Sequence, residues 1–255
     1  MSVLTTVRGD RIAYDDSGPA EAPAVMFITG AGPDRAGDPT TRATAELLAT
    51  QGIRSLFADR LGRGESVSNG PITLDAQLAA IAELAAISRA PVVLVGHSSG
   101  CALAMLAAGR VPNVAGMFLW EAPLGLFPEG AAAWWASVRE SIDAGDLEAA
   151  VARYMAGMPP EWLDALKQTP EYPRIVLGWV PDGEALAAVE QRGYATSAPL
   201  VALTATETFP GMVATADALA AAAATGTSER MPGSDHSWNA DAMAHRLADF
   251  LHPLS

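Results

Sequence analysis

The chain alternates between short apolar runs and amphipathic stretches along most of its length. Uninterrupted apolar runs are typical of strands that are covered on both faces of a sheet. Residues 3–7 and 11–15 instead alternate between apolar and polar positions and predict a hairpin that turns at Gly9 and Asp10. Including this hairpin, the pattern predicts strands at residues 3–7, 11–15, 24–28, 53–58, 91–95, 114–120, 199–206 and 227–231.

Helices are predicted between most of these strands. In one of them, Leu74, Leu78, Ile81 and Leu84 form an apolar stripe that begins after an N-cap at Thr73. The other helices are predicted around residues 43–48, 101–108, 216–225 and 240–251. Regular alternation of strand and helix predicts an α/β fold, with a mostly parallel central sheet and helices on both faces.

A sharp turn is predicted at Gly96-His97-Ser98-Ser99-Gly100, between the strand at 91–95 and the helix at 101–108. A serine at the apex of such a turn has strained backbone angles, and only very small residues fit two positions before and after it. At this point the chain resembles the α/β-hydrolase fold family. The resemblance implies that Ser98 is the nucleophile.

Residues 126–197 interrupt the alternation, because they contain several short helical segments and no predicted strand. In the family that the chain resembles, an insertion here is a helical cap over the active site. We therefore expect a core domain of residues 1–125 and 198–255 and a cap subdomain of residues 126–197. Aromatic and methionine side chains then either line an apolar pocket or pack the cap onto the core. The candidate substrate-binding residues are Trp134, Trp135, Met155, Met158, Trp179 and Trp238.

A serine hydroxyl needs a base, usually a histidine that is oriented by a carboxylate. His97 adjoins Ser98, so its side chain is expected to leave the turn in another direction. His245 and His252 lie in or after the last helix. His236 remains, in a loop at the position where the family places its base.

The carboxylate departs from the commonest pattern of the family, which has an acid at the position that Thr208 occupies here. Glu121 follows the strand at 114–120 directly, and some α/β-hydrolases, including the zearalenone-type lactonases, keep their acid at this strand end. An unpaired carboxylate that is half-buried costs free energy, so we expect an acid at this place to have a partner and a function. We assign Glu121, with Glu207 and Asp235 as alternatives and a structural salt bridge as the other interpretation.

Two N–H donors are needed for the oxyanion that forms when Ser98 attacks a carbonyl. The resemblance assigns them to the backbone of Ser99 and of Ala31. The family often has His-Gly before the second donor, whereas this chain has Thr29-Gly30. A phosphate-binding interpretation of this glycine-rich loop fails, because Arg35 stands where a third glycine belongs.

The composition of the 255-residue chain argues against some classes of binding partner. A net charge of −13 and the absence of any basic cluster argue against nucleic acid and anionic membranes. No apolar run approaches the length of a membrane span, and Cys101 is the single cysteine, so we expect a cytoplasmic location. No metal-binding spacing occurs, no cofactor is implied, and a homodimer is compatible with the sequence.

These residues predict a serine hydrolase that cleaves a carboxylic ester or lactone of a small, largely apolar molecule. A carbon–carbon bond hydrolase, a thioesterase or a cofactor-free perhydrolase would use the same triad. Epoxide and haloalkane hydrolases of this fold use an aspartate nucleophile, so Ser98 argues against both. A ligand receptor that kept the fold without turnover is the alternative from another class.

Overall fold

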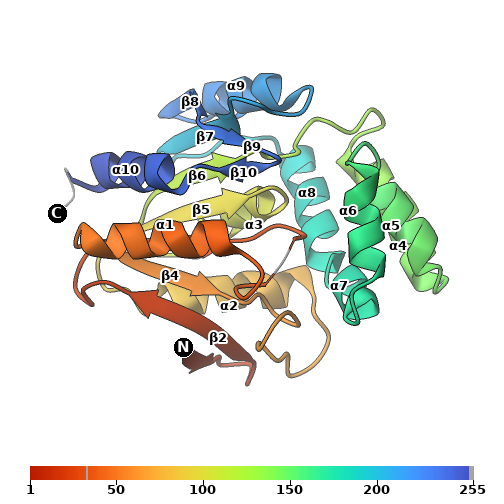
Figure 1. Ribbon diagram of the computed structural model, residues 1–255, viewed down its shortest axis with the longest axis horizontal. Coiled ribbons are helices and arrows are strands. Elements are labelled where there is room, and N and C mark those ends of the chain that lie inside the picture. The colour runs from red at the N-terminus through yellow and green to blue at the C-terminus, as the bar shows by residue number, and fades with distance from the viewer. Residues whose placement is uncertain (33, 253–255) are drawn as a thin grey trace.

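A single eight-stranded sheet organises the protein (Figure 1), whose computed structural model describes residues 1–32 and 34–252. The strand order is β1-β2-β4-β3-β5-β6-β7-β8. β2 pairs antiparallel with β1 and β4, and all other neighbours are parallel. The predicted α/β class and mostly parallel sheet are confirmed. The strands are β1 (Ser2–Thr5), β2 (Arg11–Ser17), β3 (Ala24–Ile28), β4 (Arg54–Ala58), β5 (Val92–His97), β6 (Val114–Trp120), β7 (Leu200–Ala205) and β8 (Gly226–Met231).

Both faces of the sheet are covered, which explains the uninterrupted apolar runs. Along β5, Val93 and Val95 join the core on one face and Leu94 joins the core on the other, as expected when side chains alternate along a strand. Burial of each such side chain contributes about 1.5–3 kcal/mol. One face is covered by α1 (Pro39–Thr50) and α10 (Ala240–Leu251), and the other by α2 (Leu74–Ala85), α3 (Gly100–Ala107) and α9 (Met212–Ala222).

Thr73 caps α2 as the sequence predicts, because its hydroxyl accepts a hydrogen bond from the Ala76 N–H at 3.2 Å. The helix ends at Ala85, one residue after Leu84, the last position of its apolar stripe. Beyond it, the N–H groups of Ile87 and Ser88 bond carbonyls three residues earlier. The chain therefore tightens into turns before it enters β5.

Five helices lie between β6 and β7, in the part of the chain predicted to be a cap. Figure 1 shows α4 to α7 grouped at one end of the sheet, beyond α8. Gly183 of α8 allows α4 to approach, because a Cβ there would lie 2.0 Å from the Trp135 ring. These helices are α4 (Ala131–Asp143), α5 (Leu147–Tyr154), α6 (Pro160–Lys167), α7 (Tyr172–Leu177) and α8 (Val180–Arg192). The division into core and cap stays a prediction, and residues 253–255 of the predicted core lie outside the described residues.

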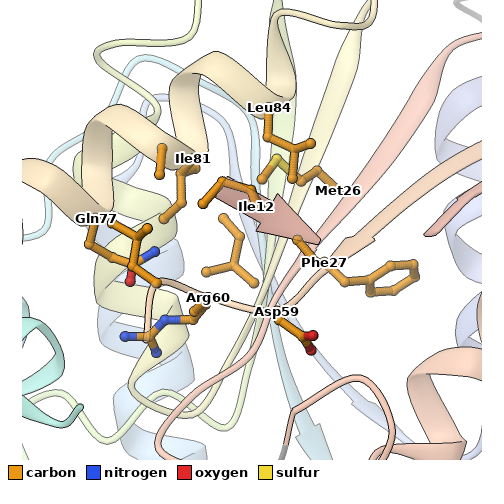
Figure 2. A pocket seen from close by; sticks show the side chains of 12 residues that line it. Ile12, Met26, Phe27, Asp59, Arg60, Gln77, Ile81 and Leu84 are labelled. Carbon is orange, nitrogen blue, oxygen red and sulfur yellow. The ribbon is translucent and has the colours of Figure 1, made fainter. Parts of the chain in front are cut away.

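A small cavity lies between the sheet and α2 (Figure 2). Its volume of about 20 Å³ suffices for roughly one water molecule. Ile12, Met26 and Ile81 line it, together with Gln77, whose buried Oε1 has no hydrogen-bond partner among the described residues. The cavity is too small for an organic substrate.

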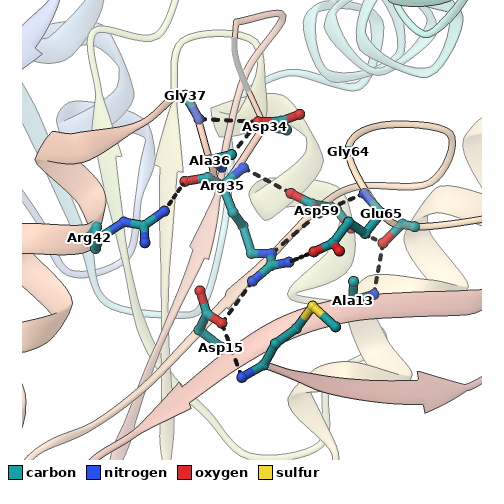
Figure 3. A network of polar contacts seen from close by, with 12 residues as sticks. Ala13, Asp15, Asp34, Arg35, Ala36, Gly37, Arg42, Asp59, Gly64 and Glu65 are labelled. Carbon is teal, nitrogen blue, oxygen red and sulfur yellow. Dashed lines mark hydrogen bonds and ion pairs between the residues drawn. The ribbon is translucent and has the colours of Figure 1, made fainter.

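The loops after β3 and β4 are tied together by Arg35 (Figure 3). Its guanidinium contacts Asp15 at 2.7 Å, Asp59 at 3.3 Å and Glu65 at 2.8 Å. The Asp59 carboxylate also accepts the backbone N–H groups of Arg35 and Glu65. A Cβ on Gly64 would lie 2.4 Å from this carboxylate, so the turn after β4 requires a glycine there. The network fixes the far end of the loop that carries Ala31.

Candidate active site

Ser98 occupies the apex of a sharp turn between β5 and α3, with a φ of 55°. A Cβ on Gly96 would lie 2.6 Å from the Cys101 Cα, and a Cβ on Gly100 would lie 2.2 Å from the Ile28 carbonyl oxygen. Both glycines are therefore required by close backbone approach, as the sequence predicts for this turn. Ser98 is only partly buried and lines a cavity.

The loop after β3 (residues 29–32, the β3 loop) lies directly against this turn. A Cβ on Gly30 would lie 2.7 Å from the His97 carbonyl oxygen and 2.9 Å from the Ser98 Cβ. Neither the Ala31 N–H nor the Ser99 N–H donates a hydrogen bond to another described residue. The two predicted oxyanion donors are therefore not used in hydrogen bonds within the described part of the chain.

His236 stands at the tip of a two-residue hairpin between β9 (Gly233–Ser234) and β10 (Ser237–Trp238), which sequence analysis treats as an irregular loop. Asp235 and His236 have φ values of 50° and 65°. Positive φ at both central residues suits the twist of a tight hairpin. A residue with a side chain adopts positive φ only at a cost in free energy.

Glu121 and His236 meet beside this hairpin. The Glu121 Oε2 lies 2.5 Å from the His236 Nδ1. The other carboxylate oxygen accepts the Ala205 N–H at 3.1 Å and the Thr208 hydroxyl. Burial would raise the pKa of this carboxyl, but the hydrogen bonds from His236 and Thr208 outweigh burial and hold the pKa below its usual value. Glu121 is thus an ionised, buried carboxylate.

Thr208 has a role that the sequence does not reveal. It stands where most relatives are expected to carry the acid, and here its hydroxyl donates to Glu121 instead. The two alternative acids lie elsewhere: Glu207 and Asp235 are both exposed. Of the three candidate carboxylates, only that of Glu121 bonds the His236 ring.

The His97 side chain contacts the backbone of His236, a supporting contact that the sequence does not reveal. Its Nε2 lies 2.9 Å from the His236 carbonyl oxygen, which also accepts the Trp120 Nε1–H at 3.1 Å. Because a carbonyl only accepts hydrogen bonds, the His97 Nε2 carries the proton. Burial and the nearby His236 lower the pKa of His97 to about 3, so its ring is neutral. Two donors therefore hold the strained backbone of His236.

Backbone strain is concentrated at this site. The non-glycine residues with positive φ among the described residues are Ser98, Glu121, Asp235 and His236. Each such conformation costs about 1–3 kcal/mol and persists only where the surroundings enforce it. Three of the four are the predicted nucleophile, acid and base.

The His236 Nε2 is buried and has no hydrogen-bond partner among the described residues. Ser98 Oγ is thus not bonded to it in this structure. At their carboxyl ends β5 and β6 pair with His97 opposite Trp120, and the Ser98 N–H donates to the Trp120 carbonyl at 2.9 Å. Ser98 and Glu121 therefore follow neighbouring strand ends. Catalytic hydrogen bonds are often long in unliganded sites and tighten when substrate binds.

A cavity of about 310 Å³ opens beside Ser98 and Ser99. Its lining is mostly apolar, with hydroxyls from Ser98, Ser99 and Tyr154, and none of the described side chains that line it is charged. Two of the predicted substrate-binding residues, Trp134 and Met158, line it. The other principal apolar lining residues carry no distinguishing signal in the sequence; they are Leu126, Phe127, Leu186, Phe209 and Met212.

The remaining predicted substrate-binding residues do not line this cavity. Trp135 packs against Gly183, and Met155 joins the apolar cluster within the helical insertion. The Trp179 Nε1–H donates to the Ala31 carbonyl at 3.1 Å. Trp238 is buried against the sheet and donates to the Thr44 hydroxyl at 2.9 Å. Their large apolar surfaces are used in packing, an outcome that residue type does not distinguish from ligand binding.

A metal site, a reactive cysteine and a membrane-spanning helix each have requirements against which the described residues can be compared. Within the described residues, no three His, Cys, Asp or Glu side chains come together as metal ligands. Cys101 is fully buried, and burial raises the pKa of its thiol. Over the same residues, none of the helices combines the length and apolarity needed to span a membrane.

Comparison with known proteins gives a consistent fold. A sequence profile described as "Alpha/beta hydrolase family" matches residues 25–250. An alpha/beta hydrolase from Sphaerobacter thermophilus superposes with a TM-score of 0.78 at 23% identity, covering 98% of this chain and 99% of that chain. An enol-lactonase from Burkholderia xenovorans LB400 gives 0.67 at 19%, covering 98% and 100%. An esterase from Exiguobacterium antarcticum gives 0.67 at 15%, covering 98% and 99%. No curated protein matches the chain.

Proposed function

We propose that this chain, which belongs to the alpha/beta hydrolase family, hydrolyses a carboxylic ester or lactone of a small, largely apolar molecule. The observation that carries the proposal is the buried Glu121–His236 pair next to the strained turn of Ser98; the His236 Nε2 has no partner among the residues that the structure describes. Bound substrate would bring Ser98 Oγ and His236 Nε2 into hydrogen-bond contact.

In the first step, Ser98 Oγ attacks the carbonyl carbon and its proton passes to His236 Nε2. The N–H groups of Ala31 and Ser99 bind the oxyanion, and Glu121 stabilises the imidazolium. Collapse of the tetrahedral intermediate breaks the bond to the leaving oxygen, which takes the proton from His236. Water then attacks the acyl-enzyme with His236 as base and releases the acid and Ser98. With a lactone, the leaving alcohol stays attached to the acyl group.

The cavity supports an apolar acyl or alkoxy group. No charged side chain lines it, so a charged substrate would lose its hydration without compensation. The volume of about 310 Å³ lies at the lower end of the range for small-molecule sites, about 300–1,000 Å³. An esterase and an enol-lactonase are among the structural neighbours, although at this identity they share only the fold with this chain.

The test combines covalent labelling with turnover. A fluorophosphonate probe is expected to label Ser98 stoichiometrically, and p-nitrophenyl esters of increasing chain length, simple lactones and acyl thioesters are assayed with Ser98→Ala as the control. Steady ester or lactone turnover that Ser98→Ala abolishes supports the proposal. Preference for thioesters would reassign the substrate class, and ligand binding without labelling or turnover would indicate a receptor.

A further inference from the structure

A buried cluster of charges lies behind the β3 loop. Asp182 of α8 is 0% exposed. Its carboxylate accepts hydrogen bonds from both terminal nitrogens of Arg60 at 2.7 Å and from one terminal nitrogen of Arg63 at 2.9 Å. The Ser99 hydroxyl donates to the same carboxylate at 2.7 Å. One side chain from the helical insertion therefore connects the turn after β4 to the residue that follows Ser98.

The same two arginines bond the β3 loop. Arg60 Nη1 donates to the carbonyl oxygens of Thr29 at 2.9 Å and Gly30 at 3.2 Å. Arg63 Nη1 also donates to the Gly30 carbonyl oxygen. This single carbonyl thus accepts hydrogen bonds from two guanidinium groups.

The Gly30 carbonyl and the Ala31 N–H belong to one resonance-stabilised peptide group. A cation that bonds the oxygen draws electron density from the nitrogen, which makes the N–H a stronger donor. The effect is largest where water is excluded, and both arginines are only 5% exposed. The cluster also holds two guanidinium groups for one carboxylate, so positive charge is in excess near the expected oxyanion.

We propose that Arg60 and Arg63 are positioning residues that fix and polarise the peptide between Gly30 and Ala31, and that Asp182 holds both arginines and Ser99 in place. The inference rests on the proposed function, because it assigns the Ala31 N–H to an oxyanion. The Asp182 carboxylate then positions both N–H donors of the oxyanion hole. It positions the Ala31 N–H through the two arginines, and the Ser99 N–H through the Ser99 hydroxyl.

The protonation states agree with this arrangement. Burial and the neighbouring Arg60 lower the pKa of Arg63 to about 10, which leaves it charged at neutral pH. Burial would raise the pKa of Asp182, but the two arginines hold it below its usual value. A purely structural cluster that locks α8 to the sheet would have the same charges, so the experiment must separate stability from catalysis.

Arg63→Gln is the main variant, because it removes one cation and leaves Arg60 to balance Asp182. We expect kcat for the best p-nitrophenyl ester to fall about 10-fold or more, less than the roughly 10²- to 10³-fold cost of losing an oxyanion donor. KM should stay within about threefold. The inhibition constant of an alkyl trifluoromethyl ketone, to which serine adds as a tetrahedral oxyanion, should weaken by the same factor as kcat/KM. Arg63→Lys, which restores the charge, should recover most of the loss.

Arg54→Gln is the matched control. Arg54 is also buried, bonded to the Asp16 carboxylate at 2.7 Å and to the Ala20 carbonyl at 2.9 Å, and contacts neither the β3 loop nor Asp182. The Arg54→Gln variant should have a lower free energy of unfolding than the wild type and an unchanged kcat. The proposal is overturned if Arg63→Gln keeps kcat and ketone affinity, if its loss lies wholly in KM, or if Arg63→Lys is as impaired.

Two further measurements keep the test decisive. If Arg63→Gln does not fold, Ser99→Ala replaces it, since it removes only the hydroxyl that bonds Asp182; a parallel loss of kcat and ketone affinity is then expected, and unchanged values overturn the proposal. Failure of the proposed function would look different, because the wild-type chain itself would neither turn over esters nor be labelled at Ser98.

Discussion

Glu121 Oε2 lies 2.5 Å from His236 Nδ1, and this bond joins the end of β6 to a hairpin more than a hundred residues later in the chain. The pair orients the ring so that its other nitrogen, Nε2, is buried and bonds no residue in the described ranges 1–32 and 34–252. If Ser98 completes this arrangement with substrate, the three residues act as a unit, and their substitutions should not be additive.

Ser98→Ala and His236→Ala should each lower kcat by about 10⁴-fold or more. The double variant should be no worse than either single one, because removal of one member already disables the other. Steady-state ester hydrolysis measures all three, with circular dichroism to establish folding. Losses that multiply in the double variant would contradict a shared mechanism.

Glu121→Gln should reduce kcat strongly, by up to about 10⁴-fold as for other triad acids, because a neutral amide cannot stabilise the imidazolium and favours the wrong ring tautomer. Glu207→Gln is the matched control, since Glu207 is exposed and follows the neighbouring strand. Its kcat should stay within about twofold. The opposite ranking would assign the acid to Glu207.

Folding stability should decrease as the pH falls below about 6.5, the usual pKa of histidine in an unfolded chain. His97 has a pKa of about 3 in the folded protein, so between these values the unfolded state binds a proton that the folded state does not. The stabilisation is therefore complete above pH 6.5 and is lost progressively toward pH 3.

Urea denaturation between pH 4.5 and 7.5 measures this effect, because Glu121 and Asp182, whose pKa values are lowered, contribute mainly below that range. His97→Gln keeps a side-chain N–H but does not titrate, so it should flatten the dependence. If wild type and variant respond equally to pH, His97 is not the group responsible.

Gly100→Ala should destabilise the protein by about 1–3 kcal/mol or prevent folding, because its Cβ would lie 2.2 Å from the Ile28 carbonyl oxygen. Gly109→Ala is the control, since its Cβ would meet nothing closer than 3.9 Å. Thermal unfolding compares them, with about 2–4 °C expected for each kcal/mol in a chain of this size. A normal melting temperature for Gly100→Ala would show that the turn can relax.

The α/β class, the central strands and the turn at Ser98 can be predicted from the amino-acid sequence alone. These depend on local features: apolar runs, helical spacing and glycines within two residues of the serine. Glu121 and His236 could be proposed as acid and base from their places in the chain: Glu121 directly follows a strand, and His236 remained after the other histidines were set aside.

The contacts that support those residues depend on the three-dimensional fold. Thr208 donates to Glu121, His97 holds the His236 backbone, and Asp182 reaches Ser99 across 83 positions of sequence. The fold likewise places Trp134 and Met158 in the lining of the cavity, whereas Trp135 and Trp238 pack in apolar cores. Such contacts join segments far apart in the chain, and apolar residues bury equally well against protein or ligand, so composition and spacing carry no signal that separates the two outcomes.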